Sequence, residues 1–332
     1  MLVSSRRILM TCFAIATVAL VAPAGVAHAN APFAKTQAPG WFRMTLGDFE
    51  VTALNDGTIA LPLEKMLSNT TPAKTDAALA KAYLKPPFES SVNGYLVNTG
   101  TKLVLIDAGT GGFFGPTLGK LVANLKASGY QPEQVDEIYV THLHGDHIGN
   151  LVANGKIVFP NAIVRAGKAD AEYWLSQANL DKAPEGGKDN FKSAQASINP
   201  YAAAGKFKPI EAEGELVPGI RALPTPGHTP GHTVYIVESK GQKLVVWGDL
   251  MHLAAVQFPD PSVTVQFDSD SKAAAVQRKK VFADVAKTGA FAAAAHVSFP
   301  GIGQLRADGA GYRWYPVNYV NSAPSSPPAA GK

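Results

Sequence analysis

The sequence predicts a layered α/β fold in a single domain, and three observations favour this class. Apolar residues make up 46% of the 332 residues and charged residues 17%, a composition that supports a large buried core and excludes a disordered or fibrous chain. Segments with strand-like and helix-like periodicity alternate along the chain, which is typical of layered α/β architecture. Because no break in composition marks a second domain, residues 30–320 are expected to form one unit.

The unit is expected to begin with β-strands. Between residues 42 and 61, apolar runs are separated by Gly47-Asp48 and by Asn55-Asp56-Gly57, and both separators are typical of hairpin turns. A further strand pair is expected at residues 92–98 and 102–107.

Helices are expected between the strands. One is predicted at residues 72–84, with Thr71 as its cap, Pro72 at its first position and Pro86-Pro87 as its stop. Leucines at helical spacing and a closing glycine predict another at residues 116–129. The alternation continues with strands near residues 137–141, 157–164, 232–238 and 243–248 and helices near 168–178 and 271–288.

The two ends of the chain are expected to lie outside this unit. Residues 1–29 have the features of a cleaved export signal: Arg6 and Arg7, then an apolar run, then Ala27-His28-Ala29 as a cleavage site. The two arginines fit either a twin-arginine signal or an ordinary secretory leader. The mature chain is therefore expected in the periplasm or outside the cell. Residues 321–332 are expected to be a disordered tail.

Charge and cysteine content exclude several function classes. Of the 30 basic residues, 28 remain after removal of Arg6 and Arg7, and they face 26 acidic residues. A net charge this small excludes a nucleic-acid partner of the usual electrostatic kind. No second apolar span follows the leader, so no membrane contact is expected after cleavage. Cys12, the only cysteine, lies in the leader, so the mature chain has no disulfide, thiol nucleophile or cysteine metal ligand.

The heptapeptide Thr-His-Leu-His-Gly-Asp-His concentrates metal-binding side chains directly after an apolar strand. Side chains two apart in an extended segment point the same way, so His142 and His144 can bind one cation. The turn at Gly145 then directs Asp146 and His147 toward another. Imidazole combined with carboxylate favours Zn²⁺ over Ca²⁺ or Mg²⁺, which prefer oxygen ligands.

Three positions farther along complete a longer pattern: His228 after Thr-Pro-Gly, Asp249 after one strand and His296 after another. In this order the residues resemble the metallo-β-lactamase superfamily. Five of the seven histidines outside the leader fall on the pattern, which satisfied core histidines or a chance cluster do not explain. The resemblance implies a four-layer αβ/βα sandwich with the site at one edge, between two sheets.

The resemblance also implies a binuclear centre with two Zn²⁺ ions, although other divalent transition metals suit the same ligands. The implied ligands are His142, His144 and His228 for one ion, Asp146, His147 and His296 for the other, and Asp249 as the bridge between them. The implied nucleophile is a metal-bound hydroxide, with Asp146 or Asp249 as the catalytic carboxylate that relays a proton to the leaving group. No serine nucleophile is expected, because the chain has no Gly-x-Ser-x-Gly motif.

Two other polar residues are expected beside the ligands. His232 is interpreted as a packing residue, because Pro230-Gly231 starts a strand that points it away from His228. Asp107 resembles the family's aspartate that orients a ligating histidine, and a turn-forming aspartate at a strand end is an equally good interpretation.

Within the superfamily, the chain is similar to the methyl parathion hydrolase family and its lactonase relatives over nearly the whole mature length. Non-catalytic segments carry this similarity, at residues 44–50, 114–119, 131–137, 206–209 and 297–303. A homodimer is compatible with it, because dimers are common among these relatives.

The similarity implies an aromatic substrate pocket formed by Phe114, Trp174 and Phe191, with core packing as the alternative for each. Three further pocket positions depart from the organophosphate-degrading type: Met66 in place of Arg, His252 in place of Leu and Phe267 in place of Leu. His252 is open to three interpretations, as a pocket wall, a substrate hydrogen-bond partner or an additional metal contact.

These departures bear on the substrate, because a bulky Phe267 and a polar His252 narrow the space for a tetrahedral phosphotriester. The sequence therefore favours hydrolysis of small aromatic lactones or aryl esters, with weak organophosphate activity. An efficient organophosphate triester hydrolase is the alternative within the family, and a non-catalytic exported metal-binding protein is the alternative outside it.

Overall fold

The structure is a computed structural model that describes residues 31–321. The expected signal peptide, and all of the expected tail but Asn321, lie outside the described residues. The chain divides into two units, Met1–Gln37 and Ala38–Lys332. Residues 31–37 of the first unit contain no helix or strand. A search of residues 31–321 finds no helix with the length and apolar character needed to cross a membrane.

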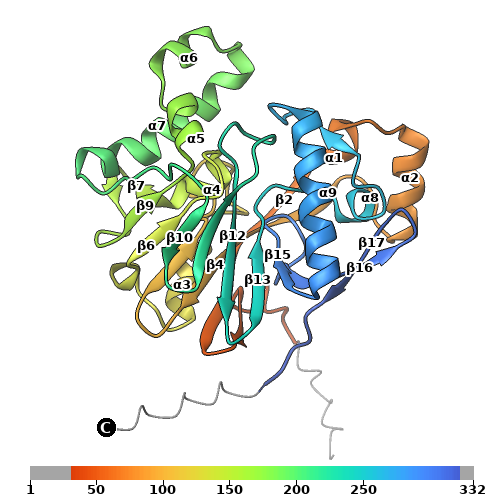
Figure 1. The fold of residues 1–332 in the computed structure, drawn as a ribbon, viewed down its shortest axis with the longest axis horizontal. Helices are drawn as coiled ribbons and strands as arrows, with labels where there is room; N and C mark the ends of the chain where they lie inside the picture. The colour runs from red at the N-terminus through yellow and green to blue at the C-terminus, as the bar shows by residue number, and fades with distance from the viewer. Residues whose placement is uncertain (1–30, 322–332) are drawn as a thin grey trace, which may run out of the picture. The chain divides into compact units, whose positions relative to one another are not determined.

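Two mixed β-sheets form the centre of the second unit (Figure 1). The first contains β1 (Trp41–Leu46), β2 (Phe49–Leu61), β4 (Phe88–Asn98), β5 (Leu103–Ile106), β6 (Glu137–Tyr139) and β9 (Ile163–Arg165), in that order. The second contains β10 (Gly214–Val217), β11 (Ile220–Pro224), β12 (Thr233–Ser239), β13 (Gln242–Val246), β15 (Phe291–Ala293), β16 (Ile302–Asp308) and β17 (Gly311–Pro316). Two small ribbons pair β3 (Leu67–Ser68) with β14 (Thr264–Val265) and β7 (Val152–Ala153) with β8 (Lys156–Ile157).

Helices cover the outer faces of both sheets. They are α1 (Leu63–Met66), α2 (Pro72–Lys81), α3 (Leu121–Ala127), α4 (Gly145–Ile148), α5 (Lys168–Trp174), α6 (Gln177–Lys182), α7 (Lys188–Ala203), α8 (Ala254–Gln257) and α9 (Ser271–Thr288). Short 3₁₀ turns span Pro132–Gln134, Gly149–Leu151 and Glu185–Gly187. In Figure 1, α5, α6 and α7 gather on one side, and α1, α2, α8 and α9 on the other.

Several strands are apolar along their whole length, which is typical of strands that are buried on both faces. Such a strand must be covered on each face, and this explains the layering. In β5, Leu103 and Leu105 pack against the helices outside the first sheet, whereas Val104 and Ile106 point into the core between the sheets. In the second sheet, Val245 of β13 packs with residues of α9. The two sheets and their helix layers form a four-layer αβ/βα sandwich in one domain, and this confirms the predicted fold class.

The predicted elements of the first half are found with two corrections. The β1–β2 hairpin turns at Gly47-Asp48, but residues 55–57 form a bulge inside β2 rather than a turn. A side chain at Gly57 would lie 2.1 Å from the carbonyl oxygen of Thr117, so the bulge brings β2 against the loop between β5 and α3. The helix α2 begins at Pro72 with its Thr71 cap, as expected. The predicted helix at residues 116–129 is confined to Leu121–Ala127.

The second half shows larger differences. The predicted strand at residues 157–164 is divided between β8 and β9, and the predicted helix at 168–178 ends at Trp174 before α6 begins. The helix α9 has the predicted bounds. The strand expected before His296 is β15, whereas the 16-residue helix α7 and the strands β10, β11, β16 and β17 were not predicted as elements.

Candidate metal centre

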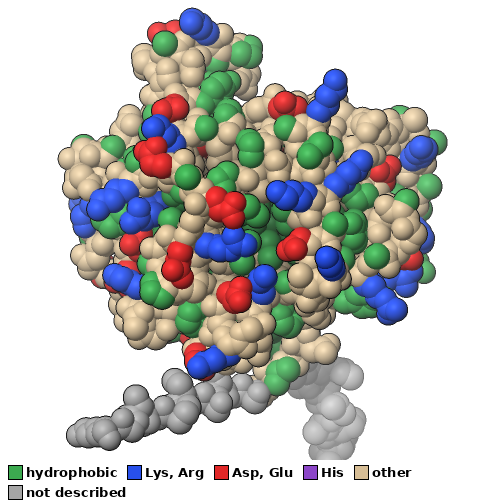
Figure 2. Space-filling view, in the orientation of Figure 1, with side chains coloured by type: hydrophobic (Ala, Val, Ile, Leu, Met, Phe, Trp, Pro, Cys, Tyr) green, Lys and Arg blue, Asp and Glu red, His purple; other side chains and the backbone are tan. Residues whose placement is uncertain are grey.

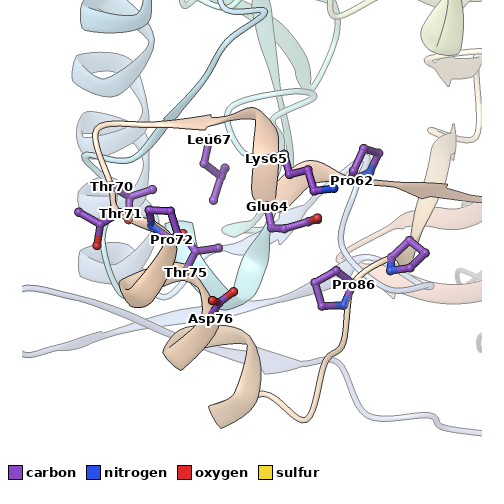
Figure 3. Close-up of a pocket in the computed structure, with 11 residues that line it drawn as sticks. Pro62, Glu64, Lys65, Leu67, Thr70, Thr71, Pro72, Thr75, Asp76 and Pro86 are labelled. Carbon is purple, nitrogen blue, oxygen red and sulfur yellow. The ribbon is translucent and has the colours of Figure 1, made fainter.

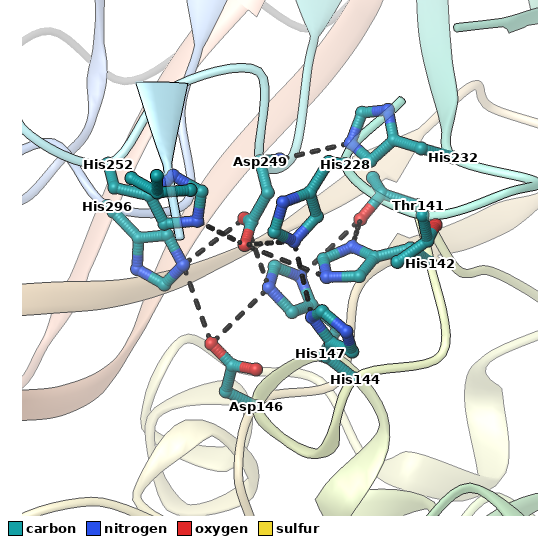
Figure 4. Close-up of polar contacts among 12 residues, drawn as sticks. Thr141, His142, His144, Asp146, His147, His228, His232, Asp249, His252 and His296 are labelled. Carbon is teal, nitrogen blue, oxygen red and sulfur yellow. Dashed lines mark hydrogen bonds and ion pairs between the residues drawn. The ribbon is translucent and has the colours of Figure 1, made fainter. Parts of the chain in front are cut away.

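Loops at the carboxyl ends of strands bring seven predicted side chains together (Figure 4). His142 and His144 follow β6, and the short helix α4 presents Asp146 and His147. His228 lies in the loop between β11 and β12, Asp249 follows β13, and His296 follows β15. The site lies where both sheets end, because its residues come from strands of each sheet.

Among the described residues, the seven side chains form two groups that could hold a metal ion, and they share one aspartate. The groups are His142, His144, His228 and Asp249, and Asp146, His147, His296 and Asp249. We call them the first and the second group. Within each group, one ligand atom from every side chain lies within 4.8 Å of the others.

The two carboxylate oxygens of Asp249 face different groups. Its Oδ2 lies 3.6 Å from Nε2 of His142 and 3.4 Å from Nε2 of His228. Its Oδ1 lies 3.2 Å from Nε2 of His147 and 3.1 Å from Nε2 of His296. Ligand atoms around a tetrahedral ion with bonds of about 2.0–2.1 Å lie roughly 3.4 Å apart. The spacing therefore fits a pair of cations on either side of one carboxylate.

Hydrogen bonds on the far ring nitrogens orient three of the imidazoles. The Nδ1 of His147 lies 2.8 Å from Oδ2 of Asp107, and the Nδ1 of His228 lies 2.9 Å from Oδ1 of Asp268. The Nδ1 of His296 lies 3.0 Å from the carbonyl oxygen of Ser91. An Nδ1–H that donates to such an acceptor leaves Nε2 unprotonated and directed at the centre, as a metal ligand requires.

Buried polar atoms without hydrogen-bond partners mark the same place. Among the described residues, Nε2 of His142, Nε2 of His147 and Oδ1 of Asp249 are buried and accept or donate no hydrogen bond. Buried polar atoms normally have a hydrogen-bond partner. Two nitrogens and one oxygen that lack such a partner within one cluster therefore indicate a place where a ligand binds. Two divalent cations would satisfy all three, and the residues present fit them.

Ionisation states in the cluster also suit metal binding. Burial, together with the charge of His228, lowers the pKa of His144 to about 3, and burial likewise lowers the pKa of His142. Burial opposes ionisation of Asp249, but the surrounding imidazoles outweigh it and hold its pKa well below the ordinary value. Neutral imidazoles and an ionised carboxylate are the forms that bind metals.

The second group shows the opposite balance at both of its imidazoles. Burial lowers the pKa of His296, but the carboxylates of Asp249 and Asp146 outweigh it and raise this pKa above the ordinary value. Burial lowers the pKa of His147, but the carboxylates of Asp249, Asp146 and Asp107 outweigh it and raise this pKa well above the ordinary value. The carboxylates thus stabilise a positive charge between them, whether a proton or a cation supplies it.

Two other histidines lie beside the groups without belonging to either. His232 accepts a hydrogen bond from the backbone N–H of Asp249 at 3.1 Å, and its Nδ1 lies 2.8 Å from Oγ1 of Thr225. Both ring nitrogens are engaged away from the centre, which agrees with its interpretation as a packing residue. His252 directs Nε2 to Oδ2 of Asp249 at 2.9 Å and stacks on His296 with the ring centroids 5.2 Å apart.

A cavity of about 190 Å³ opens onto the centre, and three of the six predicted pocket residues line it. Phe114, His252 and Phe267 are among its lining residues. Its other lining side chains are Ile59, Leu61, Leu63, Ser90, Val92, Thr110, Leu118, His144, Asp146, Asn190, Asp249 and His296. Leu63 and Val92 are 2% exposed, whereas Phe114 and Phe267 are 42% and 39% exposed. Aliphatic side chains therefore form the floor and the two phenylalanines the mouth.

The other three predicted pocket residues are not among the side chains that line this cavity. Trp174 and Phe191 are buried in the core outside the first sheet, with their ring centroids 4.7 Å apart. Met66 packs against the small apolar cluster around Leu63 and Leu79. Helix α5 turns Trp174 inward, where its ring meets His144 edge-on at 5.2 Å, so it supports a ligand instead of facing substrate.

The rest of the described surface offers no second centre of this kind. A larger hollow of about 700 Å³ lies between α1, α2 and Pro86-Pro87 (Figure 3), but no histidine lines it. On the face drawn in Figure 2, basic and acidic side chains are interspersed. Within residues 31–321, side chains that could hold a metal ion gather only in the two groups.

Sequence reasoning missed two aspartates that support the histidines. Asp268 orients His228 from 40 residues away, and Asp170 holds the loops on which the first group stands. Neither has a characteristic spacing from the histidines. The only local signal for Asp268 was its position directly after Phe267, a predicted pocket residue.

Comparisons with known proteins agree with this geometry. Residues 88–294 match the sequence profile of the Metallo-beta-lactamase superfamily. The chain is 30% identical over 163 residues to an N-acyl homoserine lactonase of Bacillus cereus, a match that covers 48% of this chain and 56% of that protein. The chain thus spans about half the length of the curated relatives it matches.

Two solved structures resemble the chain over most of its length. Hydrolase AbOPH in the beta lactamase superfamily superposes with a TM-score of 0.82 at 37% identity, covering 86% of this chain and all of that one. AidC, a dizinc quorum-quenching lactonase, superposes with a TM-score of 0.79 at 29% identity, covering 85% of this chain and 99% of that one.

Proposed function

The chain belongs to the metallo-beta-lactamase superfamily and is a metal-dependent hydrolase, and from this premise we propose that it opens lactones at a binuclear zinc centre. Small aromatic lactones and aryl esters are the proposed substrates, with N-acyl homoserine lactones as the related class named by its relatives. The observation that carries the proposal is the placement of Asp249. Its two oxygens face separate ligand groups beside a cavity with an apolar floor.

The proposed ligands follow from the two groups. His142, His144 and His228 would hold one ion, Asp146, His147 and His296 the other, and Asp249 both. When bound, a pair of divalent cations lowers the pKa of water and stabilises negative charge that develops on an ester oxygen. Three buried donor atoms without other partners support this assignment.

We propose that the chain's own carboxylates divide the remaining work. Asp146 lines the cavity and its side chain is 24% exposed, so its carboxylate could accept the proton that the attacking water loses and pass it to the leaving oxygen. Asp249 is buried and faces four ring nitrogens in the two groups, so it serves to hold the centre together. His252 fixes Oδ2 of Asp249 and forms a wall of the cavity.

Cavity size supports a small substrate head. Pockets for drug-sized ligands measure about 300–1,000 Å³, and this cavity of about 190 Å³ is smaller. A flat bicyclic lactone is the proposed occupant, because Phe114 and Phe267 offer aromatic surface in the cavity that Asp146 and Asp249 also line. A tetrahedral phosphotriester with three substituents would find less room, because Phe267 and His252 both line the cavity and pack edge-on with their ring centroids 4.9 Å apart.

A substrate panel with metal control tests the proposal. Purified chain loaded with zinc would be assayed against dihydrocoumarin, N-hexanoyl homoserine lactone, phenyl acetate and methyl parathion, before and after treatment with chelator. We expect chelator-sensitive turnover of at least one lactone that exceeds turnover of methyl parathion. Faster turnover of methyl parathion would instead support the similarity to the methyl parathion hydrolase family. Absence of chelator-sensitive turnover on every compound would contradict the proposal.

We also propose that the chain acts in the periplasm or outside the cell. The basis is the sequence of residues 1–29 alone, with its arginine pair, apolar run and Ala27-His28-Ala29 site. Amino-terminal sequencing of protein recovered from the periplasm should begin at Asn30. A chain that retains Met1 and stays in the cytoplasm would contradict export.

A further inference from the structure

Asp170 is a buried carboxylate that the proposed chemistry does not use. It lies in the first turn of α5 and has no exposed surface. Its place is beneath the metal centre, between the first sheet's helix layer and the loop that precedes β12.

Three hydrogen bonds from two different loops end on this carboxylate. Its Oδ2 accepts the backbone N–H of Leu143 at 2.9 Å and the hydroxyl of Thr229 at 3.0 Å. Its Oδ1 accepts the backbone N–H of Gly231 at 2.5 Å. Every partner donates, so the carboxylate fits the site in its ionised form without a proton of its own.

The two loops are those that carry the three imidazoles of the first group. Leu143 stands between His142 and His144, and Thr229 directly follows His228. Asp170 accepts no hydrogen bond from a residue of α4, which carries Asp146 and His147, or from the loop that carries His296. Asp170 thus joins the two segments that carry the first group and has no direct hydrogen bond to the elements that carry Asp146, His147 and His296.

The backbones are also in direct contact at this point. A side chain at Gly231 would lie 2.3 Å from the backbone nitrogen of Asp170, and one at Gly167 would lie 2.2 Å from the carbonyl oxygen of Gly231. The start of α5 and the turn after His228 therefore fit together without spare room, and the carboxylate fixes their register.

We propose that Asp170 is a positioning residue that sets the spacing of His142, His144 and His228 and thereby the affinity of the first group for its metal ion. The proposal rests on the proposed binuclear centre. Asp107 differs from it, because Asp107 contacts Nδ1 of His147 in the second group and also accepts the N–H of Thr141, the residue before His142. Asp170 hydrogen-bonds only to segments that carry the first group's imidazoles, so it is the side chain to test for an effect on that group.

The test measures metal affinity one group at a time. In a His296→Ala background the first group keeps all its donors, and in a His228→Ala background the second group does. Asp170→Asn would be combined with each, and Co²⁺ affinity and visible absorption would be recorded. The substitution keeps the side-chain shape but places an amide N–H against a backbone N–H.

We expect Asp170→Asn to weaken Co²⁺ binding at the first group by about 10–100-fold and to change its visible spectrum, as for other residues that orient ligands. Affinity at the second group should stay within about twofold on the same reasoning. Asp107→Asn should weaken binding at the second group, because Asp107 contacts Nδ1 of His147, and Asp284→Asn, at an exposed residue of α9, should change affinity at neither group.

Two results would overturn the positioning role: equal loss at both groups, which indicates a general effect on folding, or unchanged affinity and spectrum at the first group. If Asp170→Asn does not fold, Thr229→Val decides, because it removes one of the three hydrogen bonds with little change in shape. Weaker binding confined to the first group would support the role, and unchanged binding would refute it. Failure of the binuclear centre itself would appear separately, as wild-type protein that binds no metal.

Discussion

Asp249 differs from the other six side chains of the centre because it belongs to both ligand groups. Each imidazole contributes to one group, so its loss leaves the other intact. Loss of the Asp249 carboxylate removes a ligand from both groups and leaves the buried imidazoles without the negative charge that faces them. A single substitution at Asp249 therefore affects both groups at once.

Asp249→Asn should reduce kcat/KM for the preferred lactone by more than the roughly 10–100-fold typical of residues outside the ligand set. Metal content should fall below that of the wild type, because an amide oxygen carries no charge to bridge two cations. Steady-state kinetics and metal analysis of the same preparation check both. Unchanged metal content with near-normal activity would show that Asp249 does not bridge.

Phe267→Leu should shift specificity toward bulkier substrates. Phe267 lines the mouth of the cavity, and its ring meets those of His228 and His252. A smaller side chain widens the entrance, so methyl parathion turnover relative to dihydrocoumarin turnover should rise about tenfold, equivalent to about 1.4 kcal/mol of differential transition-state binding. Phe113→Leu is the matched control, because Phe113 is exposed but is not among the residues that line the cavity. An equal shift in both variants would exclude a specific role for Phe267.

The spacing of the histidines and aspartates in the sequence predicted which side chains form the centre, but it did not predict which residues support them. The heptapeptide that starts at Thr141 brings four donors together by local geometry alone. Asp268 and Asp170 act across 40 and 27 to 61 residues, respectively, and such contacts follow from the fold and not from any spacing rule. Trp174 and Phe191 show the same limit, since an aromatic side chain gives no sequence signal for pocket or core.

At the scale of elements, Asp56 organises the loop that carries Phe114. Its Oδ2 accepts hydrogen bonds from the N–H and hydroxyl of Thr110 and from the N–H of Gly119. Its Oδ1 accepts from the N–H of Leu121 and from the amide of Asn150. One buried carboxylate thus joins both ends of the loop to the start of α3.

Asp56→Ala should lower the free energy of unfolding by about 3 kcal/mol or more, because it leaves several buried donors without an acceptor. Asp270→Ala offers a matched comparison, since Asp270 caps α9 through one hydrogen bond to the N–H of Ala273 and its loss should cost about 1 kcal/mol. Urea unfolding measures both. Equal losses would show that the loop does not depend on Asp56.

The Asp56 contacts also explain why two predictions for the first half of the chain were wrong. The helix expected at residues 116–129 begins only at Leu121, because the carboxylate fixes the preceding residues as a loop. Asn55-Asp56-Gly57 has the composition of a turn but forms a bulge that points Asp56 inward.

Helix α9 was predicted with its true bounds because its cap and its closing Gly289 are local signals. Helix α7 has Gly187 before it and Pro200 inside it, which hid its periodicity.

For the whole molecule, the alternation of strands and helices was sufficient to predict layering but not the division into two sheets. The pairing of β13 with β15 and of β5 with β6 joins segments separated by helices, and such pairings are set by packing across the core. The resemblance to the superfamily supplied the four-layer arrangement that periodicity alone did not.

Removal of metal should affect the stability of the whole domain as well as activity. The ligands come from loops of both sheets, so cations bound only in the folded state stabilise all layers together. At a free metal concentration about 1,000-fold above Kd, the stabilisation is about 4 kcal/mol. Chelated protein should unfold at lower temperature than the zinc-loaded protein and recover on zinc addition. Identical thermal unfolding curves would mean that no metal is bound in the folded state.

The central claim is that two transition-metal ions lie on either side of the Asp249 carboxylate. Crystals of zinc-loaded protein measured at the zinc absorption edge test it most directly. We expect two anomalous peaks, one bounded by His142, His144 and His228 and the other by Asp146, His147 and His296, with an oxygen of Asp249 at each. A single peak, or peaks remote from Asp249, would contradict it.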